Sequence, residues 1–237
     1  MIMNVLIIGG STDIGINLTK KLVNNGDNVI SSYYKHIVDI PSVDSYKCDV
    51  RCEEDIDKLI NIANKRFNND YILINMAAIS QDNSILNKTK SEFMNVLEVN
   101  LVGMFLCNQI YSRYNNGGLI INISSTDGID TYSEYNIDYA ISKMGIIKLS
   151  EIMGKYVDNK IICICPNWID SNSTKSMNQE YLDSELKRIG QSRLIGMDEF
   201  TTSMINIIFE GYSNRMNKDT EIIRIDIKDD RLWIERM

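Results

Sequence analysis

The stretch VLIIGGSTDIG, residues 5–15, decides the fold of this chain. Its four leading aliphatic residues predict a short strand buried on both faces, and its last residues predict a helix that starts near Ile14. The glycines between strand and helix permit a tight turn. A helix that begins directly after such a turn presents free backbone N–H groups and the positive end of its dipole. The stretch therefore predicts a binding site for a phosphate-bearing nucleotide.

Single residues of this loop have distinct expected roles. Gly9 permits the sharp turn, and Gly15 permits the helix to pack closely on the sheet. Asp13 is interpreted as the N-cap of the helix, which turns its carboxylate toward the helix N-terminus. An ordinary strand–helix turn without a ligand is the alternative interpretation. The residues expected to bind the nucleotide are Gly9, Ser11, Thr12, Asp13, Ile14 and Gly15.

Strand-like and helix-like segments alternate along the rest of the chain, which is typical of a parallel sheet covered by helices on both faces. With 237 residues, 44% of them hydrophobic, the chain can bury the core of one α/β domain, and we expect a single domain over residues 1–237. Strands are predicted at Val5–Ile8, Asn28–Ser32, Asp44–Lys47, Tyr71–Asn75, Leu119–Ser124, Lys160–Cys165 and Glu221–Asp226. Helices are predicted at Ile14–Asn24, Glu53–Arg66, Ser91–Tyr114, Tyr139–Tyr156 and Glu199–Tyr212.

Charge and apolar patterning exclude several classes of protein. The net charge is −7 with acids and bases interleaved, so nucleic acid is not an expected partner. No uninterrupted apolar run reaches the ~18 residues of a membrane span, so no membrane partner is expected. The first residues lack the features of a secretory signal, and the 5 cysteines are interpreted as reduced thiols. We therefore expect a cytoplasmic protein.

The single histidine, His36, limits the possible chemistry. One histidine cannot build a multi-histidine zinc site, and the cysteines lack paired C-x-x-C spacing, so no metal site is expected. A Ser-His-Asp hydrolase would depend on His36, and the sequence has no Gly-x-Ser-x-Gly nucleophile motif. Acid–base chemistry must therefore fall to Tyr, Lys or carboxylate side chains.

Tyr139 and Lys143 are the candidate acid–base pair. Residues four apart share one face of a helix, and an ammonium beside a phenol favours the phenolate. Bringing a Tyr pKa from about 10 to about 7 takes roughly 4 kcal/mol, which a neighbouring Lys in a partly dry cleft can supply. The same spacing recurs at Tyr156 and Lys160, so a chance pairing on a helix surface is the alternative for either copy.

The end of the second strand bears on which nucleotide binds. A carboxylate there would accept hydrogen bonds from the adenosine ribose and favour NAD. The chain has no carboxylate between Ser31 and Asp39, and Lys35 can pair with a ribose 2′-phosphate. The sequence therefore favours NADP over NAD, with a merely solvated Lys35 as the alternative.

Seven segments, taken together and in order, resemble the short-chain dehydrogenase/reductase family over the whole chain. The loop at residues 9–15 is similar to the family's glycine-rich cofactor motif, and Asn100 lies where the family has a catalytic asparagine that kinks a helix. Ser125 aligns with the substrate-positioning serine, and Tyr139 with Lys143 matches the catalytic pair. The remaining matches are Cys48-Asp49-Val50, Asn75-Met76-Ala77-Ala78, Pro166-Asn167-Trp168-Ile169-Asp170-Ser171, and Arg193 to Gly196 with Asp198-Glu199.

The resemblance implies a single-domain Rossmann fold, a doubly wound parallel sheet of about seven strands with helices on both faces. It also implies hydride transfer between NADP, or NAD, and a carbonyl or secondary-alcohol carbon, nearest to the 3-oxoacyl-carrier-protein reductases. Tyr139 would pass the proton and Lys143 would bind the nicotinamide ribose. Ser125 would hold the substrate oxygen, and Asn100 would anchor a water. Cofactor contacts beyond the glycine loop are expected at Tyr33, Lys35, Asp49, Val50, Asn75, Ala77, Tyr139, Lys143, Pro166, Ile169 and Ser171.

Four residues depart from the family pattern: Ile8, Asp13, Ala78 and Asn167 replace a usual Thr or Gly. The C-terminal strand also lacks the usual Gly-Gly turn. A dinucleotide-binding protein without turnover, such as a sensor or an assembly subunit, is therefore the alternative function.

The resemblance also bears on substrate and assembly. Residues 172–192 lie where the family has a mobile substrate lid, although an exposed helix pair is equally expected there. An acidic rim before Tyr139 disfavours docking of an acidic carrier protein. The family implies a homodimer or homotetramer built from the long helices Ser91–Tyr114 and Tyr139–Tyr156. The rim residues are Asp127, Asp130, Glu134 and Asp138, a small basic group is Lys187, Arg188 and Arg193, and the expected interface side chains are Met104, Phe105 and Met153.

Overall fold

The computed structural model of the protein describes residues 1–37 and 39–237. Within these residues one sheet has eight strands, in the order β3-β2-β1-β4-β5-β6-β7-β8. Neighbouring strands from β3 to β7 run parallel, and β8 pairs antiparallel with β7. The strands are β1 (Asn4–Ile8), β2 (Asn28–Tyr33), β3 (Asp44–Lys47), β4 (Ile72–Asn75), β5 (Leu119–Ile123), β6 (Lys160–Pro166), β7 (Glu221–Lys228) and β8 (Arg231–Arg236). The predicted α/β fold and all seven predicted strands are confirmed.

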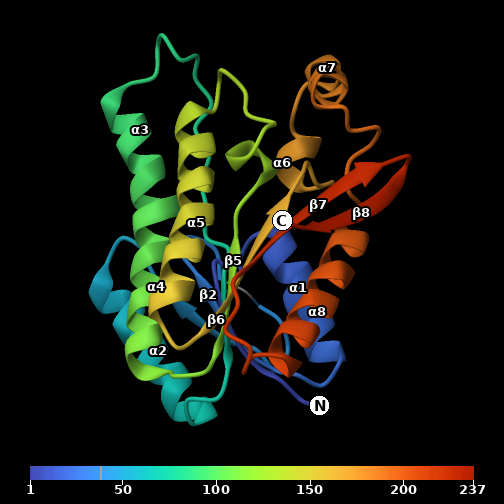
Figure 1. Ribbon diagram of the computed structural model, residues 1–237. Coiled ribbons are helices and arrows are strands. Elements are labelled where there is room, and N and C mark those ends of the chain that lie inside the picture. The colour runs from blue at the N-terminus through green and yellow to red at the C-terminus, as the bar shows by residue number, and fades with distance from the viewer. Residues whose placement is uncertain (38) are drawn as a thin grey trace.

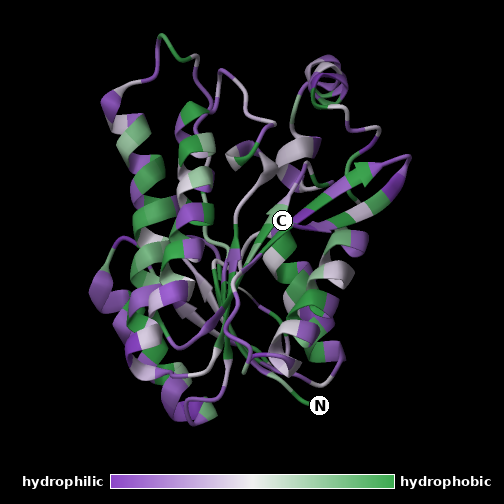
Figure 2. Cartoon of the chain, viewed as in Figure 1, coloured by the Kyte–Doolittle hydropathy of each residue, from purple (hydrophilic) through white to green (hydrophobic). Residues whose placement is uncertain are grey.

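Helices cover both faces of this sheet (Figure 1). On one face α1 (Asp13–Asn24) packs beside α8 (Met197–Ser213), and on the other lie α2 (Glu53–Phe67), α4 (Gly103–Tyr114) and α5 (Ile137–Tyr156). Hydrophobic residues fill the strands between these layers, and hydrophilic residues dominate the outer helix surfaces (Figure 2). Both faces of the central strands are buried because both are covered, which explains their continuous Ile-rich sequences.

The predicted helix Ser91–Tyr114 is present but divided. It consists of α3 (Lys90–Leu97), a π-helical turn η1 (Glu98–Val102) and α4. A π-turn inserts one extra residue into the helical ladder and often occurs at functional sites. The whole run Lys90–Tyr114 is long and apolar enough to cross a membrane, with mean hydropathy 1.2 over a window of which 39% is buried. The central helix of a globular domain has the same properties, and this run packs against α2 and α5.

Two of the three side chains expected at a subunit interface belong to the core instead. Met104 is buried beside Ile146 and Cys163, and Met153 packs against the core cluster beneath α2 and α4. Phe105 is 38% exposed, as an interface residue would be. Helix periodicity alone could not distinguish these faces, because α4 and α5 carry apolar residues on both the inner and the outer side.

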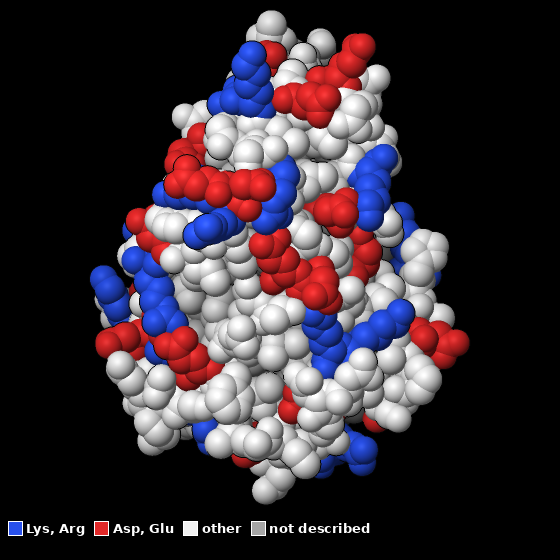
Figure 3. All heavy atoms as spheres, turned by 90° about the vertical axis from the view of Figure 1, so that its right-hand side faces the viewer, with Lys and Arg blue, Asp and Glu red and all other residues white. Residues whose placement is uncertain are grey.

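Residues 172–192 form a helix pair. These helices are α6 (Asn172–Lys175) and α7 (Gln179–Ile189), which lie above the carboxyl ends of the strands (Figure 1). Asn178 caps the start of α7, and Gly190 ends it in the left-handed conformation. Acidic and basic side chains alternate on the face formed by α7, β8 and α8 (Figure 3). Two members of the expected basic group are paired there, Arg188 with Glu185 and Arg193 with Glu199, whereas Lys187 is exposed.

The expectation of about seven strands omitted β8. The turn Asp229-Asp230 joins β7 to β8, and both residues adopt positive φ, 48° and 60°. Asp tolerates this conformation, so the pair makes the two-residue hairpin turn that glycine makes more often. The chain therefore adds an antiparallel edge strand that covers the outer side of β7.

Candidate active site

The glycine loop folds as expected, except for its helix cap. Gly9 has φ +81°, and a Cβ there would lie 2.6 Å from the Cα of Ala77, so only glycine fits. Thr12, not Asp13, is the N-cap of α1, and its Oγ1 accepts a hydrogen bond from the Gly15 N–H at 3.1 Å. The assignment of Asp13 as the cap was wrong because Thr12 has the extended backbone of a cap, which places Asp13 inside the first turn.

The Asp13 carboxylate lies between two helix N-termini. Oδ1 accepts from the Ile14 N–H at 3.0 Å, and Oδ2 accepts from the N–H of Asn172, the first residue of α6, at 2.5 Å. The negative charge is favourable at both helix ends. Asp13 therefore places its charge where a bound diphosphate would lie and links the loop to the α6–α7 pair.

Ser125, Tyr139 and Lys143 meet at one cavity of about 430 Å³, which also extends to Thr12 and Asp13. Ser125 follows β5 and starts a short 3-10 turn, η2 (Thr126–Gly128). Tyr139 and Lys143 lie one helical turn apart near the start of α5, with Lys143 Nζ 5.2 Å from the centre of the Tyr139 ring.

The second Tyr-x-x-x-Lys pair does not form a site. Tyr156 is the last residue of α5 and 84% exposed, whereas Lys160 is the first residue of β6. Their spacing crosses a helix end, so the two side chains do not share a helical face.

Burial sets the electrostatics of the Tyr–Lys pair. Burial lowers the pKa of the Lys143 ammonium to about 8. Burial also raises the pKa of Tyr139, the Asp127 carboxylate raises it further, and a hydrogen bond with Ser125 opposes the rise. The expectation that Lys143 brings the Tyr139 pKa down toward 7 is therefore wrong in this structure, because loss of hydration disfavours the charged form of both groups. Near neutral pH Tyr139 holds its proton and can donate it.

Asn100 lies at the centre of the π-turn and is fully buried. Its side chain accepts from the Ile79 N–H at 2.8 Å and donates to the Ile79 carbonyl at 2.9 Å. It also donates to Ser142 Oγ on α5 at 3.1 Å. Asn100 therefore fixes the segment after β4 against the helix that carries Tyr139 and Lys143.

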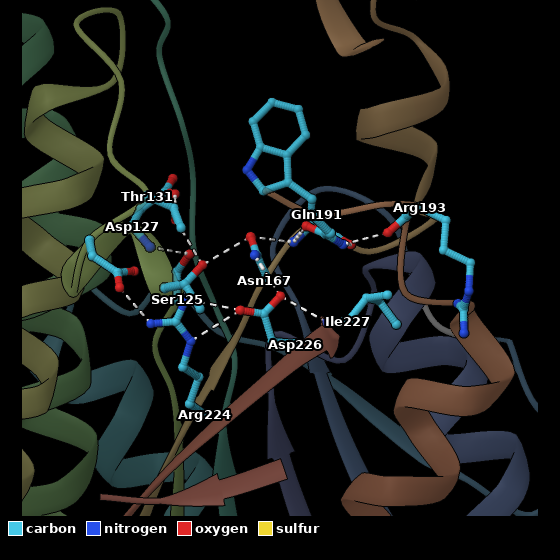
Figure 4. Close-up of polar contacts among 12 residues, drawn as sticks. Ser125, Asp127, Thr131, Asn167, Gln191, Arg193, Arg224, Asp226 and Ile227 are labelled. Atoms are coloured by element: carbon cyan, nitrogen blue, oxygen red, sulfur yellow. Dashed lines mark hydrogen bonds and ion pairs between the residues drawn. The ribbon is translucent and has the colours of Figure 1, made fainter. Parts of the chain in front are cut away.

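Polar contacts join the turn after Ser125 to strand β7 (Figure 4). The Asn167 side chain accepts from Thr126 Oγ1 at 3.1 Å and donates to Asp226 Oδ1 on β7 at 2.9 Å. All three side chains are buried. These two contacts explain why an amide replaces glycine after Pro166, because the Asn167 side chain connects β6 and β7 to the turn that follows Ser125.

Arg224 completes this connection from the same strand (Figure 4). Its guanidinium donates to Asp226 Oδ2 at 2.9 Å and pairs with Asp130 Oδ2 at 2.7 Å, on the segment between Ser125 and Tyr139. This contact could not be predicted from local sequence patterns, because the partners lie 94 residues apart.

Of the four carboxylates expected in an acidic rim, Asp130 and Glu134 are exposed, and Asp127 and Asp138 are buried. Asp138 is buried in an ion pair with Lys88 Nζ at 3.0 Å, and Asp130 pairs with Arg224. Asp127 is 6% exposed, lines the cavity, and has its pKa raised by burial. The exposed negative charge of this segment is therefore smaller than expected, because only Asp130, which pairs with Arg224, and Glu134 reach the surface.

Arg51 is a candidate cofactor residue that the sequence analysis missed. It follows β3, and its guanidinium pairs with Asp49 Oδ2 at 2.7 Å and donates to the Tyr34 hydroxyl at 2.9 Å. Lys35 lies exposed beyond the end of β2. The carboxyl ends of β2 and β3 are adjacent, because Tyr33 is in register with Lys47. Their adjacency, which the sequence alone did not reveal, brings Arg51 into contact with Tyr34, the residue before Lys35.

The other predicted cofactor residues divide into two groups. Pro166, Ile169 and Ser171 line the cavity. Asn75 instead donates to Asn108 and Asn122 in the core, Val50 packs under Gly103, and Ala77 packs under Gly9. The residues of the second group pack behind the cavity and do not line it.

The residues present fit a dinucleotide in most respects. The cavity is continuous from the α1 N-terminus to Lys143, and hydroxyls and a helix dipole suit a diphosphate. Two cations, Lys35 after β2 and Arg51 after β3, suit a ribose phosphate. Asp13 is the carboxylate at the glycine-loop end of the cavity, where its charge opposes an anionic ligand.

Comparisons with known proteins agree with this geometry. The short chain dehydrogenase family model matches residues 3–182. A 3-oxoacyl-(acyl-carrier-protein) reductase of Chlamydia trachomatis is 28% identical over 216 residues, covering 82% of this chain and 84% of that protein. The corresponding reductase of Buchnera aphidicola is 28% identical over 210 residues, covering 84% and 78%.

Solved structures agree in fold. A short-chain dehydrogenase/reductase from Serratia marcescens superposes with a TM-score of 0.79 at 20% identity, covering 94% of this chain and 96% of that one. An actinorhodin polyketide ketoreductase solved with NADPH superposes with a TM-score of 0.78 at 18% identity, covering 93% and 95%.

Proposed function

The chain belongs to the short-chain dehydrogenase family, and we propose that it transfers a hydride between NADP(H) and a carbonyl or secondary-alcohol carbon. One observation carries this proposal: Ser125, Tyr139 and Lys143 converge on a cavity that reaches the glycine loop. The names of the bacterial relatives and the NADPH-bound neighbour support NADP(H), with NAD as the second candidate. The relatives also support a 3-oxoacyl thioester as a candidate substrate.

The residues of the chain supply orientation and the proton. When bound, the reduced nicotinamide supplies the hydride that the carbonyl carbon takes up. Tyr139 donates its hydroxyl proton to the carbonyl oxygen as negative charge develops there. The Ser125 hydroxyl accepts from the Asp127 N–H at 3.1 Å, which leaves its own proton to hold the same oxygen.

Lys143 supports Tyr139 from the neighbouring turn of α5. Its ammonium donates to the Ile123 carbonyl at 2.9 Å and keeps further protons for ribose hydroxyls and for solvent. Its charge stabilises the phenolate that forms as Tyr139 loses its proton. Asn100 acts as a positioning residue for this helix.

The pH dependence of reduction should follow Lys143. With its pKa lowered to about 8, the ammonium is complete at neutral pH and disappears as the pH rises. Tyr139, whose pKa is raised, stays protonated over the same range. We expect kcat/KM to be level near neutrality and to fall about tenfold per pH unit above the Lys143 pKa. Steady-state rates across this range test the expectation, and a profile that is level to about pH 10, near the reference pKa of Lys, would contradict it.

Arg51 should set the preference for NADPH. Arg51→Ala removes a cation beside the expected 2′-phosphate, so we expect the Kd for NADPH to rise about tenfold while the Kd for NADH changes little. Isothermal titration with both cofactors measures the two constants. Lys35→Ala is the matched variant, because it removes the neighbouring exposed cation. Equal losses for NADPH and NADH in the Arg51 variant would refute a phosphate-specific role.

Titration with all four dinucleotides tests the proposed function itself. Binding followed by turnover of a carbonyl or alcohol panel supports the enzyme. Binding without turnover favours a cofactor-binding sensor or assembly subunit, a reading that the charge of Asp13 at the diphosphate position supports. Failure to bind any dinucleotide contradicts both functions.

Assembly and location follow from the same family. We expect a homodimer or homotetramer, supported by exposed apolar side chains on η1, α4 and α5: Val102, Phe105, Met144 and Ile152. The five free cysteines accord with a reducing cytoplasm. We expect α6 and α7 to act as the substrate lid of the single domain.

A further inference from the structure

Asp127 places a carboxylate inside the cavity, close to the reacting groups. It belongs to η2, two residues after Ser125, and its backbone N–H donates to the Ser125 hydroxyl. It is 6% exposed, yet it lines the same cavity as Ser125 and Tyr139. Such a group must find partners, because a buried carboxylate without hydrogen bonds is strongly unfavourable.

The protein satisfies only part of this carboxylate. Oδ1 accepts from Thr131 Oγ1 at 2.7 Å, and Oδ2 accepts from Asn136 Nδ2 at 3.0 Å (Figure 4 labels Asp127 and Thr131). An ionised carboxylate has about four acceptor positions, so about two remain. Both partners are neutral, and they hold the carboxylate in one orientation.

Nearby cations have other partners. Arg188 donates to Glu185 and to the Thr131 carbonyl at 2.9 Å, and Lys143 donates to the Ile123 carbonyl. Among the residues that the structure describes, no Lys or Arg forms an ion pair with Asp127. A donor from a bound substrate can therefore take up the remaining acceptor positions.

The surrounding wall suits a small polar molecule. Ser80, Ser133 and Asn136 bring hydroxyl and amide groups to the cavity, and Trp168 and Tyr181 bring aromatic rings. These groups hydrogen-bond and stack without a charge of their own. They therefore favour a neutral ligand with hydroxyls over a charged one.

We propose that Asp127 is a specificity-determining residue that selects a substrate with a hydroxyl beside the reacting carbonyl, a hydroxy ketone or hydroxy aldehyde. This inference rests on the proposed function and specifies its substrate. In the reduction, the carbonyl carbon gains the hydride, the carbonyl oxygen gains the Tyr139 proton, and the product is a vicinal diol. The neighbouring hydroxyl donates to Asp127 and is unchanged.

The same geometry disfavours a 3-oxoacyl thioester. Its reacting carbonyl is flanked by two carbon groups without donors, and the next polar group, one carbon further along, is the thioester carbonyl, which is an acceptor. An acceptor facing a buried carboxylate leaves both groups unpaired, and sites that bind a substrate donor strongly reject analogues that lack it.

The test compares hydroxyacetone, acetone and an acetoacetyl thioester as substrates of the full chain with NADPH. We expect kcat/KM for hydroxyacetone to exceed that for acetone by about tenfold to a hundredfold. The thioester, although it is the largest of the three, should have the lowest kcat/KM. Asp127→Asn should bring the hydroxyacetone-to-acetone ratio close to one. Asp44→Asn, at an exposed residue at the start of β3 and outside the cavity, is the matched control and should keep the wild-type ratio.

The outcomes separate this inference from the proposed function. Efficient reduction of the thioester with poor reduction of hydroxyacetone would overturn the inference and leave the oxidoreductase intact. A ratio near one in the wild-type protein, or an unchanged ratio in Asp127→Asn, would overturn it equally. Bound NADPH with no reduction of any of the three carbonyls would count against the proposed function and therefore against the inference.

Discussion

Replacing Tyr139 with Phe is expected to lower kcat for NADPH-dependent carbonyl reduction by about 10³-fold. The substitution removes one hydroxyl and keeps the ring beside Lys143. Tyr139 holds its proton near neutral pH because burial raises its pKa, so this hydroxyl carries a proton for the substrate oxygen. The Kd for NADPH should stay within about twofold, because the glycine loop and Lys143 are untouched. Single-turnover rates and cofactor titration measure the two quantities.

Tyr156→Phe provides the matched control. It removes the hydroxyl of the second Tyr-x-x-x-Lys pair, which lies at the exposed end of α5. We expect this variant to keep the wild-type rate. Retention of that rate in Tyr139→Phe would end the assignment of the proton donor, and loss of NADPH binding would show that the hydroxyl acts on the cofactor instead.

Neutralising Asp13 should strengthen cofactor binding. Asp13→Asn keeps the shape of the side chain and one of the two oxygens that accept from the Ile14 and Asn172 N–H groups, and it removes one negative charge near the expected diphosphate. Two unit charges about 4 Å apart interact by roughly 4 kcal/mol at an effective dielectric constant of 20, and rotation of the side chain away from the phosphates reduces this value. We expect the Kd for NADPH to fall about tenfold to a hundredfold, measured by isothermal titration.

Asp44→Asn is the control for overall charge. Asp44 is exposed at the start of the edge strand β3, whereas the glycine loop follows the carboxyl end of β1. Its replacement changes the net charge equally. Its Kd should match the wild-type value. A Kd that is unchanged or higher in Asp13→Asn would mean that the carboxylate helps to organise the loop, through its link to α6, more than it repels the phosphates.

Local signals were sufficient to predict the fold. Strand β6 is a continuous apolar run, α2 has acidic residues at its start and basic ones at its end, and Gly9 stands where a positive φ is required. Each of these features depends on a few neighbouring residues. The predicted strand and helix boundaries are therefore close to those observed.

The edge hairpin escaped prediction because its turn lacks glycine. Asp229 and Asp230 both adopt the left-handed conformation, which an Asp-Asp sequence does not by itself predict. The Thr12 cap was missed for a similar reason, since Thr12 and Asp13 are adjacent residues that are both good caps.

Contacts between distant segments account for most of the other differences. The Arg51 site depends on the adjacency of β2 and β3, and the burial of Asp138 depends on Lys88, from another loop. The Tyr139 pKa depends on the desolvation of the whole cleft. Spacing in the sequence singled out Ser125, Tyr139 and Lys143, which share one cavity, but it could not supply their surroundings.

The contacts of Asn167 and Arg224 connect β7 to the segment between Ser125 and Tyr139, which lies about 94 residues earlier in the chain. The segment recognised as a short chain dehydrogenase ends at Leu182, before β7 is made. During synthesis, the contacts of Asp226 with Asn167 and of Arg224 with Asp130 can therefore form only after β7 has left the ribosome and docked. A product that stopped before β7 would contain Ser125, Tyr139 and Lys143 without these contacts.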